Sequence, residues 1–156
     1  MKRVLYALLI VIAGGMAWIR LAPDDPARWH VAIFIEPGGG WTLLPPGASP
    51  VTGGANDARA SVTIFDADSR AVLERLDRIA MASPRTARLA GRPEEGRITW
   101  ITRSRVFGFP DYTTAEVRAE GPVTVVTFYA RARYGRGDFG VNAARLGDWV
   151  SRLGGP

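Results

Sequence analysis

An uninterrupted run of apolar residues near the start of the chain is its strongest pattern. The run covers residues 4–19, ends at Arg20, and follows two basic residues, Lys2 and Arg3. As a helix it would be about 24 Å long, against about 30 Å for the hydrocarbon core of a bilayer. The long flanking side chains extend this reach, because their charged ends can lie at the interface. The run therefore predicts a membrane anchor over residues 1–22.

A cleaved signal peptide is the alternative interpretation of this segment. Gly15 and Ala17 are small residues that suit a cut after Ala17. In either case Lys2 and Arg3 stay in the cytoplasm under the positive-inside rule. The rest of the chain is then exported. In a bacterium we expect a single-pass inner-membrane protein with a periplasmic C-terminal domain, or a periplasmic protein if the segment is cleaved.

Prolines and glycines dominate the next part of the chain, residues 23–59. Proline lacks the backbone N–H that a helix needs as a hydrogen-bond donor, and glycine leaves the backbone conformation unrestrained. We therefore expect an extended linker without a helix. Within it, Arg28–Ile35 has the composition of a short strand that docks on the domain. Trp41–Leu44 would form a second apolar contact. The predicted α+β domain then covers residues 60–156.

Helical periodicity appears twice in that domain. A first helix begins with Asp66 or Asp68 as its N-cap and runs to about Ala82. A second helix runs from about Val141 to Leu153. Each has an apolar stripe that a core would cover. The stripes consist of Val72, Leu73, Leu76, Ile79 and Ala80 in the first helix, and Leu146, Trp149, Val150 and Leu153 in the second.

Alternating apolar and polar positions between these helices predict strands. The four candidates are Thr86–Leu89, Arg97–Arg103, Thr113–Glu120 and Val123–Arg133. One face of the sheet would carry Ile98, Trp100, Ala115, Val117, Val126, Phe128 and Ala130. The other would carry Ile101, Arg103, Glu116, Arg118, Tyr129 and Arg131. Short connections favour antiparallel pairing. The expected fold is a two-layer α+β domain, in which two helices pack on a four-stranded antiparallel meander behind the N-terminal helix.

Composition narrows the function classes. The chain has 156 residues, enough for one domain, with no cysteine and one histidine. Disulfides, cysteine nucleophiles and multi-histidine metal centres are therefore excluded. The net charge is +5, but part of the surplus flanks the apolar run and most of the rest lies after residue 97. An exported domain without a basic helix or a lysine-rich stripe does not fit nucleic-acid binding.

The segment 130–145, ARARYGRGDFGVNAAR, is the main candidate for a binding site. Its glycines lie between a strand and a helix, where the backbone can approach a ligand closely. The free N–H groups of a helix N-terminus attract anions. A structural interpretation stays open: Asp138 would pair with Arg133 or cap the helix, Asn142 would serve as a cap or turn residue, and Phe139 would fill the core. The G-x-G-x-x-G match lacks the following strand of a dinucleotide fold.

A second cluster lies in 102–112, where a strand ends and the chain turns. Strand pairing could bring Arg103, Arg131 and Arg133 to one sheet face, with Asp111, Asp138 or Glu116 as counter-ions. Together the two segments give the candidate ligand-binding residues Arg103, Arg105, Asp111, Arg131, Arg133, Tyr134, Arg136, Asp138, Asn142 and Arg145.

These two segments resemble a known family. The blocks FGFPDYTTAEV (Phe107–Val117) and ARARYGRGDFGVNAARLGDWV (Ala130–Val150) are similar to the domain-of-unknown-function family fourteen-ninety-nine. The resemblance covers about residues 60–153. The chain departs from the family pattern at Ala130, Ala132 and Gly137, where serines are typical of the family. It implies a shared fold and, frequently, an exported or membrane-associated location, but no established activity.

The residue types favour a non-catalytic protein without cofactor or metal. A Ser–His pair would need His30, which lies in the linker and is better explained as a packing or solvent residue. Asp111 and Asp138 lie among arginines, which lower a carboxyl pKa and weaken a general acid. We expect a membrane-anchored, periplasm-facing module that binds an anionic small molecule, a lipid headgroup or an envelope protein. The alternatives are a structural accessory subunit of an envelope complex, or a carboxylate-dependent hydrolase.

Overall fold

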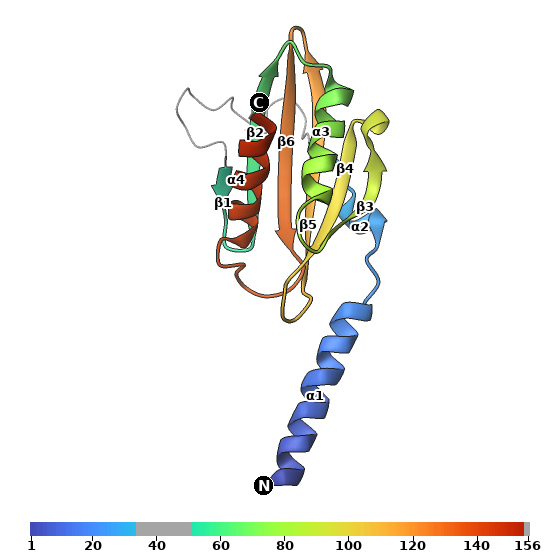
Figure 1. Cartoon of the computed structure of the whole chain (residues 1–156), viewed down its shortest axis with the longest axis vertical. Coiled ribbons are helices and arrows are strands. Elements are labelled where there is room, and N and C mark those ends of the chain that lie inside the picture. Colours follow the sequence, from blue (N-terminus) through green and yellow to red (C-terminus); the bar gives the residue numbers. More distant parts are fainter. Residues whose placement is uncertain (34–50, 155–156) are drawn as a thin grey trace.

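The structure is a computed structural model that describes residues 1–33 and 51–154. Helix α1 (Lys2–Leu21) extends from one end of the domain, as Figure 1 shows. None of its residues is buried. Within the described part of the chain, it is the one helix long and apolar enough to cross a membrane. The predicted apolar N-terminal helix is therefore present.

The sheet has six strands, whereas the sequence predicted four. All neighbours pair antiparallel in the order β1-β2-β6-β5-β4-β3. The predicted meander is present, with β3 and β5 longer than predicted. Its strands are β3 (Thr86–Arg92), β4 (Arg97–Arg103), β5 (Pro110–Glu120) and β6 (Val123–Ala132). A 3-10 turn, η1 (Pro93–Glu95), connects β3 to β4.

The two additional strands lie on the other side of β6. They are β1 (Val51–Gly53) and β2 (Asp57–Phe65), and β2 pairs with β6 along its whole length. The first half of β2 reads Asp-Ala-Arg-Ala-Ser, residue types that are depleted in strands or neutral. Tertiary pairing with β6 overrides this weak local preference, and pattern reading alone missed it.

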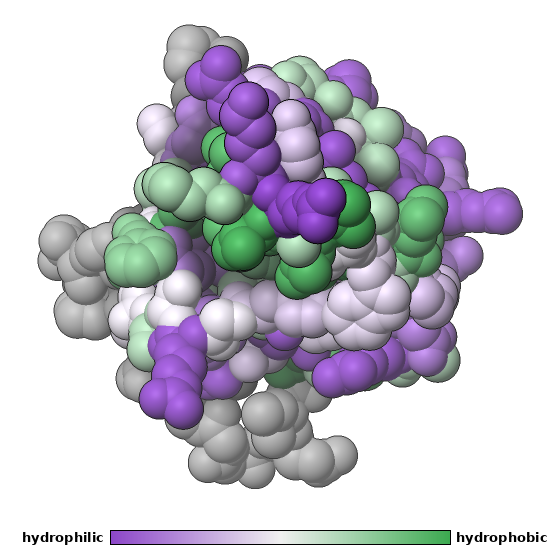
Figure 2. Space-filling model, turned by 90° about the horizontal axis from the view of Figure 1, so that it is seen from below, coloured by the Kyte–Doolittle hydropathy of each residue, from purple (hydrophilic) through white to green (hydrophobic). Residues whose placement is uncertain are grey.

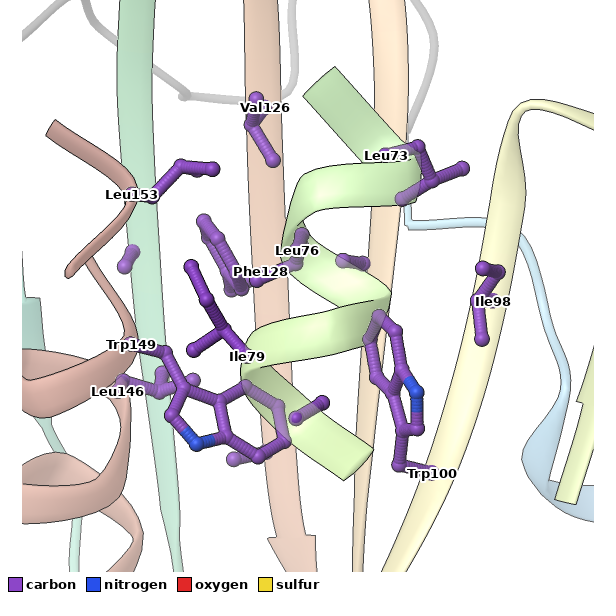
Figure 3. Close-up of a cluster of buried hydrophobic side chains, with 14 of the residues drawn as sticks. Leu73, Leu76, Ile79, Ile98, Trp100, Val126, Phe128, Leu146, Trp149 and Leu153 are labelled. Carbon is purple, nitrogen blue, oxygen red and sulfur yellow. The ribbon is translucent and has the colours of Figure 1, made fainter. Parts of the chain in front are cut away.

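The helices α3 (Ser69–Met81) and α4 (Val141–Gly154) lie on the same face of the sheet (Figure 1). Asp68 caps α3 by accepting from the Ala71 amide at 2.8 Å. The buried cluster combines both helical stripes with the predicted apolar strand face (Figure 3). At its centre, the rings of Trp100 and Trp149 meet edge to face, with centroids 5.5 Å apart.

The opposite face of the sheet is covered in part by the chain that follows α1. A short helix, α2 (Pro26–Trp29), lies there, and the strand predicted over Arg28–Ile35 is absent in its described part, residues 28–33. Asp25 caps it and Pro26 occupies its first turn, the combination that favours a helix start. The expectation of an extended segment was therefore wrong at this point. The predicted contact of Trp41–Leu44 lies outside the described residues.

Candidate functional site

The candidate residues divide between the two faces of the sheet. Successive strand residues point to opposite sides, so Asp111 and Tyr112 face in different directions. Asp111 contacts Arg145 of α4 on the helix-covered side. Tyr112 contacts Trp29 of α2 on the other side. Arg103, Arg131 and Arg133 lie on this second side, so the predicted convergence of the three arginines occurs there.

The counter-ion of Arg103 and Arg133 is Asp24, which sequence reasoning had not selected. Arg103 Nη2 donates to Asp24 Oδ2 at 2.5 Å. Arg133 Nη1 approaches Asp24 Oδ1 at 3.4 Å and donates to the Pro23 carbonyl at 3.0 Å. The Tyr112 hydroxyl donates to Asp24 Oδ1 at 2.5 Å. We call Asp24, Arg103, Tyr112 and Arg133 the Asp24 clamp; it fastens the chain just past α1 to the sheet.

An aromatic stack continues the clamp. The rings of Trp29 and Tyr112 are parallel within 9°, with centroids 3.8 Å apart. Arg131 Nη2 donates to the Trp29 carbonyl at 2.8 Å, while its buried Nε has no hydrogen-bond partner among the described residues. Burial and the hydrogen bond to Asp24 raise the pKa of Tyr112 to about 12. The hydroxyl therefore stays a donor to the carboxylate at all ordinary pH values.

His30 belongs to a chain of hydrogen bonds behind the stack. Its Nε2 accepts from Arg97 Nε at 3.4 Å, so its proton lies on Nδ1, 2.9 Å from Thr99 Oγ1. Thr99 is 2.9 Å from Thr114 Oγ1, which donates to the Trp29 carbonyl. Burial and nearby Arg97 lower the pKa of His30. A neutral His30 thus holds α2 on the sheet, in agreement with a packing role.

Glu116 holds the end of the docked segment. Its Oε2 accepts from the Ile33 amide at 2.8 Å. The same carboxylate lies 3.8 Å from Arg97 Nη1. Residues 23–33 are therefore fixed to the sheet at both ends, by Asp24 at one and Glu116 at the other.

A second polar cluster lies between α4 and the sheet. Arg145 donates to Asp111 Oδ2 at 3.0 Å and to Asn142 Oδ1 at 2.7 Å. Asp138 accepts from the amides of Gly140 (2.9 Å) and Asn142 (3.1 Å), so its role is to cap α4. The pKa of Asp111 is raised, because burial outweighs the effect of Arg145. Arginine lowers this pKa as expected, but the larger effect of burial reverses the net direction.

The remaining candidates lie at the end of the sheet next to α1. Arg105 and Arg136 are exposed on two different loops, and Tyr134 is half-buried. The rings of Phe109 and Tyr134 lie 5.9 Å apart and join the loops. Phe139 is fully exposed, so the expectation that it fills the core was wrong. The candidates thus form three groups: the clamp side, the α4 cluster and the loop end.

The comparison with protein families agrees with the resemblance of the two segments. The model described as "Protein of unknown function (DUF1499)" matches residues 43–153. The chain belongs to this family. The match begins upstream of the residues that carried the resemblance, and it spans β1 to the last turns of α4. A search of curated proteins finds no match for this DUF1499 protein.

The family match divides the Asp24 clamp. Arg103, Tyr112 and Arg133 lie inside the DUF1499 domain, whereas Asp24 and α2 lie before it. The signal in the sequence that could have found Asp24 is its position, as an acid directly after the predicted membrane anchor.

The described residues of the DUF1499 protein hold no group of three or more histidines and carboxylates that could bind a metal ion. Surface hollows lie near the start of α3, where Asp68, Ser69 and Gly121 contribute to their walls. None of the sequence-predicted candidates is among the residues that line them.

Proposed function

We propose that this DUF1499 protein is a non-catalytic module anchored in the inner membrane by α1, with its domain held at the periplasmic surface. The supporting observation is the Asp24 clamp. Only Ala22 and Pro23 separate the end of α1 from Asp24, whose carboxylate is bound to the sheet. A helix of this length and apolarity is suited to a bilayer. The clamp then positions the domain against the membrane that α1 crosses.

The charges around α1 support the orientation. Lys2 and Arg3 precede the apolar segment and Arg20 lies near its end. Two basic residues beside the N-terminal amine favour a cytoplasmic N-terminus. The domain that follows α1 is then on the periplasmic side.

The internal use of the arginines favours a structural role, as an accessory subunit of an envelope assembly. Arg103 and Arg133 bind Asp24, and Arg145 binds Asp111. These side chains are mostly covered and satisfied within the chain, so a free anion would have to displace a carboxylate. Asp138 uses both its carboxylate oxygens on backbone amides, which disfavours a hydrolase based on Asp111 and Asp138.

The test uses the absence of cysteine in the chain. A Phe65→Cys variant places one exposed thiol at the sheet end away from α1. We expect the full-length, uncleaved chain to remain in membranes after alkaline carbonate extraction. A membrane-impermeant maleimide should label it in intact spheroplasts. Labelling only after lysis would contradict the orientation, and a mature chain that begins after Ala17 would contradict the anchor.

A further inference from the structure

Two loops at the α1 end of the domain expose apolar side chains. Residues 104–109 connect β4 to β5, and residues 133–140 connect β6 to α4. The exposed large apolar residues here are Val106, Phe107, Phe139 and Val141. We call these four the loop-end patch. Figure 2 views the molecule from this end, where the apolar helix α1 points toward the viewer and makes up the hydrophobic centre of the picture.

The first loop contacts the end of α1 directly. Arg20 Nη2 donates to the Val106 carbonyl at 3.1 Å. Gly108 lies so close that a Cβ on it would be 2.7 Å from Arg20 Nε. Since Arg20 is at the last turn of α1, this loop lies where the helix leaves the apolar layer. Contact between Phe109 and Tyr134 keeps the second loop beside the first.

Phe139 has an unusual backbone conformation, which belongs to the turn that opens α4: the Val141 amide donates to the Asp138 carbonyl at 3.1 Å across Phe139 and Gly140. Its φ is +54°, in the left-handed region that bulky residues avoid. Its side chain is fully exposed and contributes nothing to the core. The turn holds the aromatic ring on the outside of the domain, where a surface beyond the chain can reach it.

Basic side chains surround the patch. Arg20, Arg105 and Arg136 are all exposed at this end. Asp138, the acid of the second loop, is occupied by the amides of Gly140 and Asn142. Apolar tips with a basic margin are the composition of surfaces that bind anionic lipid headgroups.

We propose that the loop-end patch inserts into the headgroup region of the anionic leaflet and forms a second membrane contact beside α1. This inference rests on the proposed anchoring by α1. The occupant is the lipid surface, because the Asp24 clamp and the Arg20–Val106 contact hold the patch at the point where α1 meets that surface.

The experiment uses the full-length chain in vesicles of phosphatidylcholine, with and without phosphatidylglycerol. A Val141→Cys variant carries an environment-sensitive fluorophore next to an intact Phe139, and the same label on Phe65→Cys is the control far from α1. Both positions are exposed. We expect a blue shift, and quenching by headgroup spin-labelled lipid, at position 141 and neither at position 65.

Two further variants test the chemistry of the contact. Phe139→Asn keeps a residue that accepts a positive φ and should reduce the blue shift at position 141. Arg105→Gln combined with Arg136→Gln should remove the additional shift that phosphatidylglycerol produces. Unchanged fluorescence in both variants would overturn the assignment of these residues.

Flotation of the vesicles separates the two proposals. If the chain floats with the vesicles but the label at position 141 is as water-exposed as the label at 65, the second contact is wrong and the anchor stands. If the chain does not float, the anchoring by α1 is wrong, and the lipid contact that rests on it is wrong as well.

Discussion

Asp24 carries one negative charge that two arginines and a tyrosine hydroxyl share. Its side chain is about one-fifth exposed, at 19%, so water screens these contacts less than on an open surface. A hydrogen bond to a charged group contributes about 1.5–3 kcal/mol. The loss of one carboxylate here also leaves two guanidinium groups without their partner.

Asp24→Asn should therefore lower the free energy of unfolding by about 1–3 kcal/mol. Urea denaturation of the full chain in detergent measures this change. The matched control is Asp148→Asn, because Asp148 forms an exposed helix-surface pair with Arg152, worth about 0.5 kcal/mol or less. Equal effects of the two substitutions would contradict the clamp.

Because of Tyr112, the stabilisation by the clamp should depend on pH in the alkaline range. Its pKa is raised to about 12 in the folded chain, against about 10 when unfolded. The stabilisation is therefore complete below about pH 10 and is lost as the pH rises through about 12. Titration of tyrosinate absorbance should show one late tyrosine, absent in Tyr112→Phe and shifted to lower pH in Asp24→Asn. A late tyrosine that persists in Tyr112→Phe would contradict this.

Replacement of Phe139 should stabilise the domain, whereas replacement of a core phenylalanine would destabilise it. Its left-handed backbone costs roughly 1–2 kcal/mol for a residue with a side chain. Phe139→Gly should raise the free energy of unfolding in detergent by about 1 kcal/mol, because glycine accepts this conformation freely. A loss of about 3 kcal/mol or more, typical of a buried phenylalanine, would show that the ring packs inside the domain.

At the scale of elements, the helical periodicity of apolar residues predicted α3 and α4, and the alternation of apolar and polar residues predicted the meander. Both patterns exist because each of these segments buries one apolar face. The stripe of Leu73 and Leu76 in α3 faces the strand positions Ile98 and Phe128 in the buried cluster. Strand β2 escaped prediction because its first half lacks strand-forming residues and is held by pairing with β6, although Val62–Phe65 are residue types that favour a strand.

The candidate site could be predicted only in part, for a similar reason. Alternation placed Arg103 and Arg131 on one face correctly, because that follows from local geometry. The partner of Arg103 is Asp24, 79 positions away, and no local pattern connects two residues at such a separation. The cap by Asp138 was open to prediction because it is local.

Docking of residues 23–33 should depend on pH through His30. Burial and Arg97 lower its pKa below the usual 6.5, so its contribution to docking is present above about 6.5 and is lost as the pH falls through the folded value. Acidification should lower the protection factors of the Ile33 and Trp29 amides, that is, their exchange corrected for its intrinsic pH dependence, before those of β6. His30→Gln should remove this dependence. Protection factors in wild type that do not change on acidification would contradict the role of His30.

At the scale of the whole molecule, the excess of basic over acidic residues is concentrated at particular places in the fold. Three basic residues lie at the two ends of α1, and two partly buried arginines pair with Asp24. Arg105 and Arg136 are exposed at the end next to α1. Under the proposed anchoring by α1, this positive charge would orient the chain at the membrane, because α1, the clamp and the loop-end patch lie at the same end of the domain.

The most direct test of this arrangement is the distance between α1 and the far end of the sheet. Spin labels on Trp18→Cys and Phe65→Cys in the full chain in lipid nanodiscs report it by double electron–electron resonance. We predict one narrow distance distribution that broadens strongly in Asp24→Asn. If the distance distribution is already broad with Asp24 in place, and Asp24→Asn does not change it, the claim that the clamp fixes the domain relative to α1 is wrong.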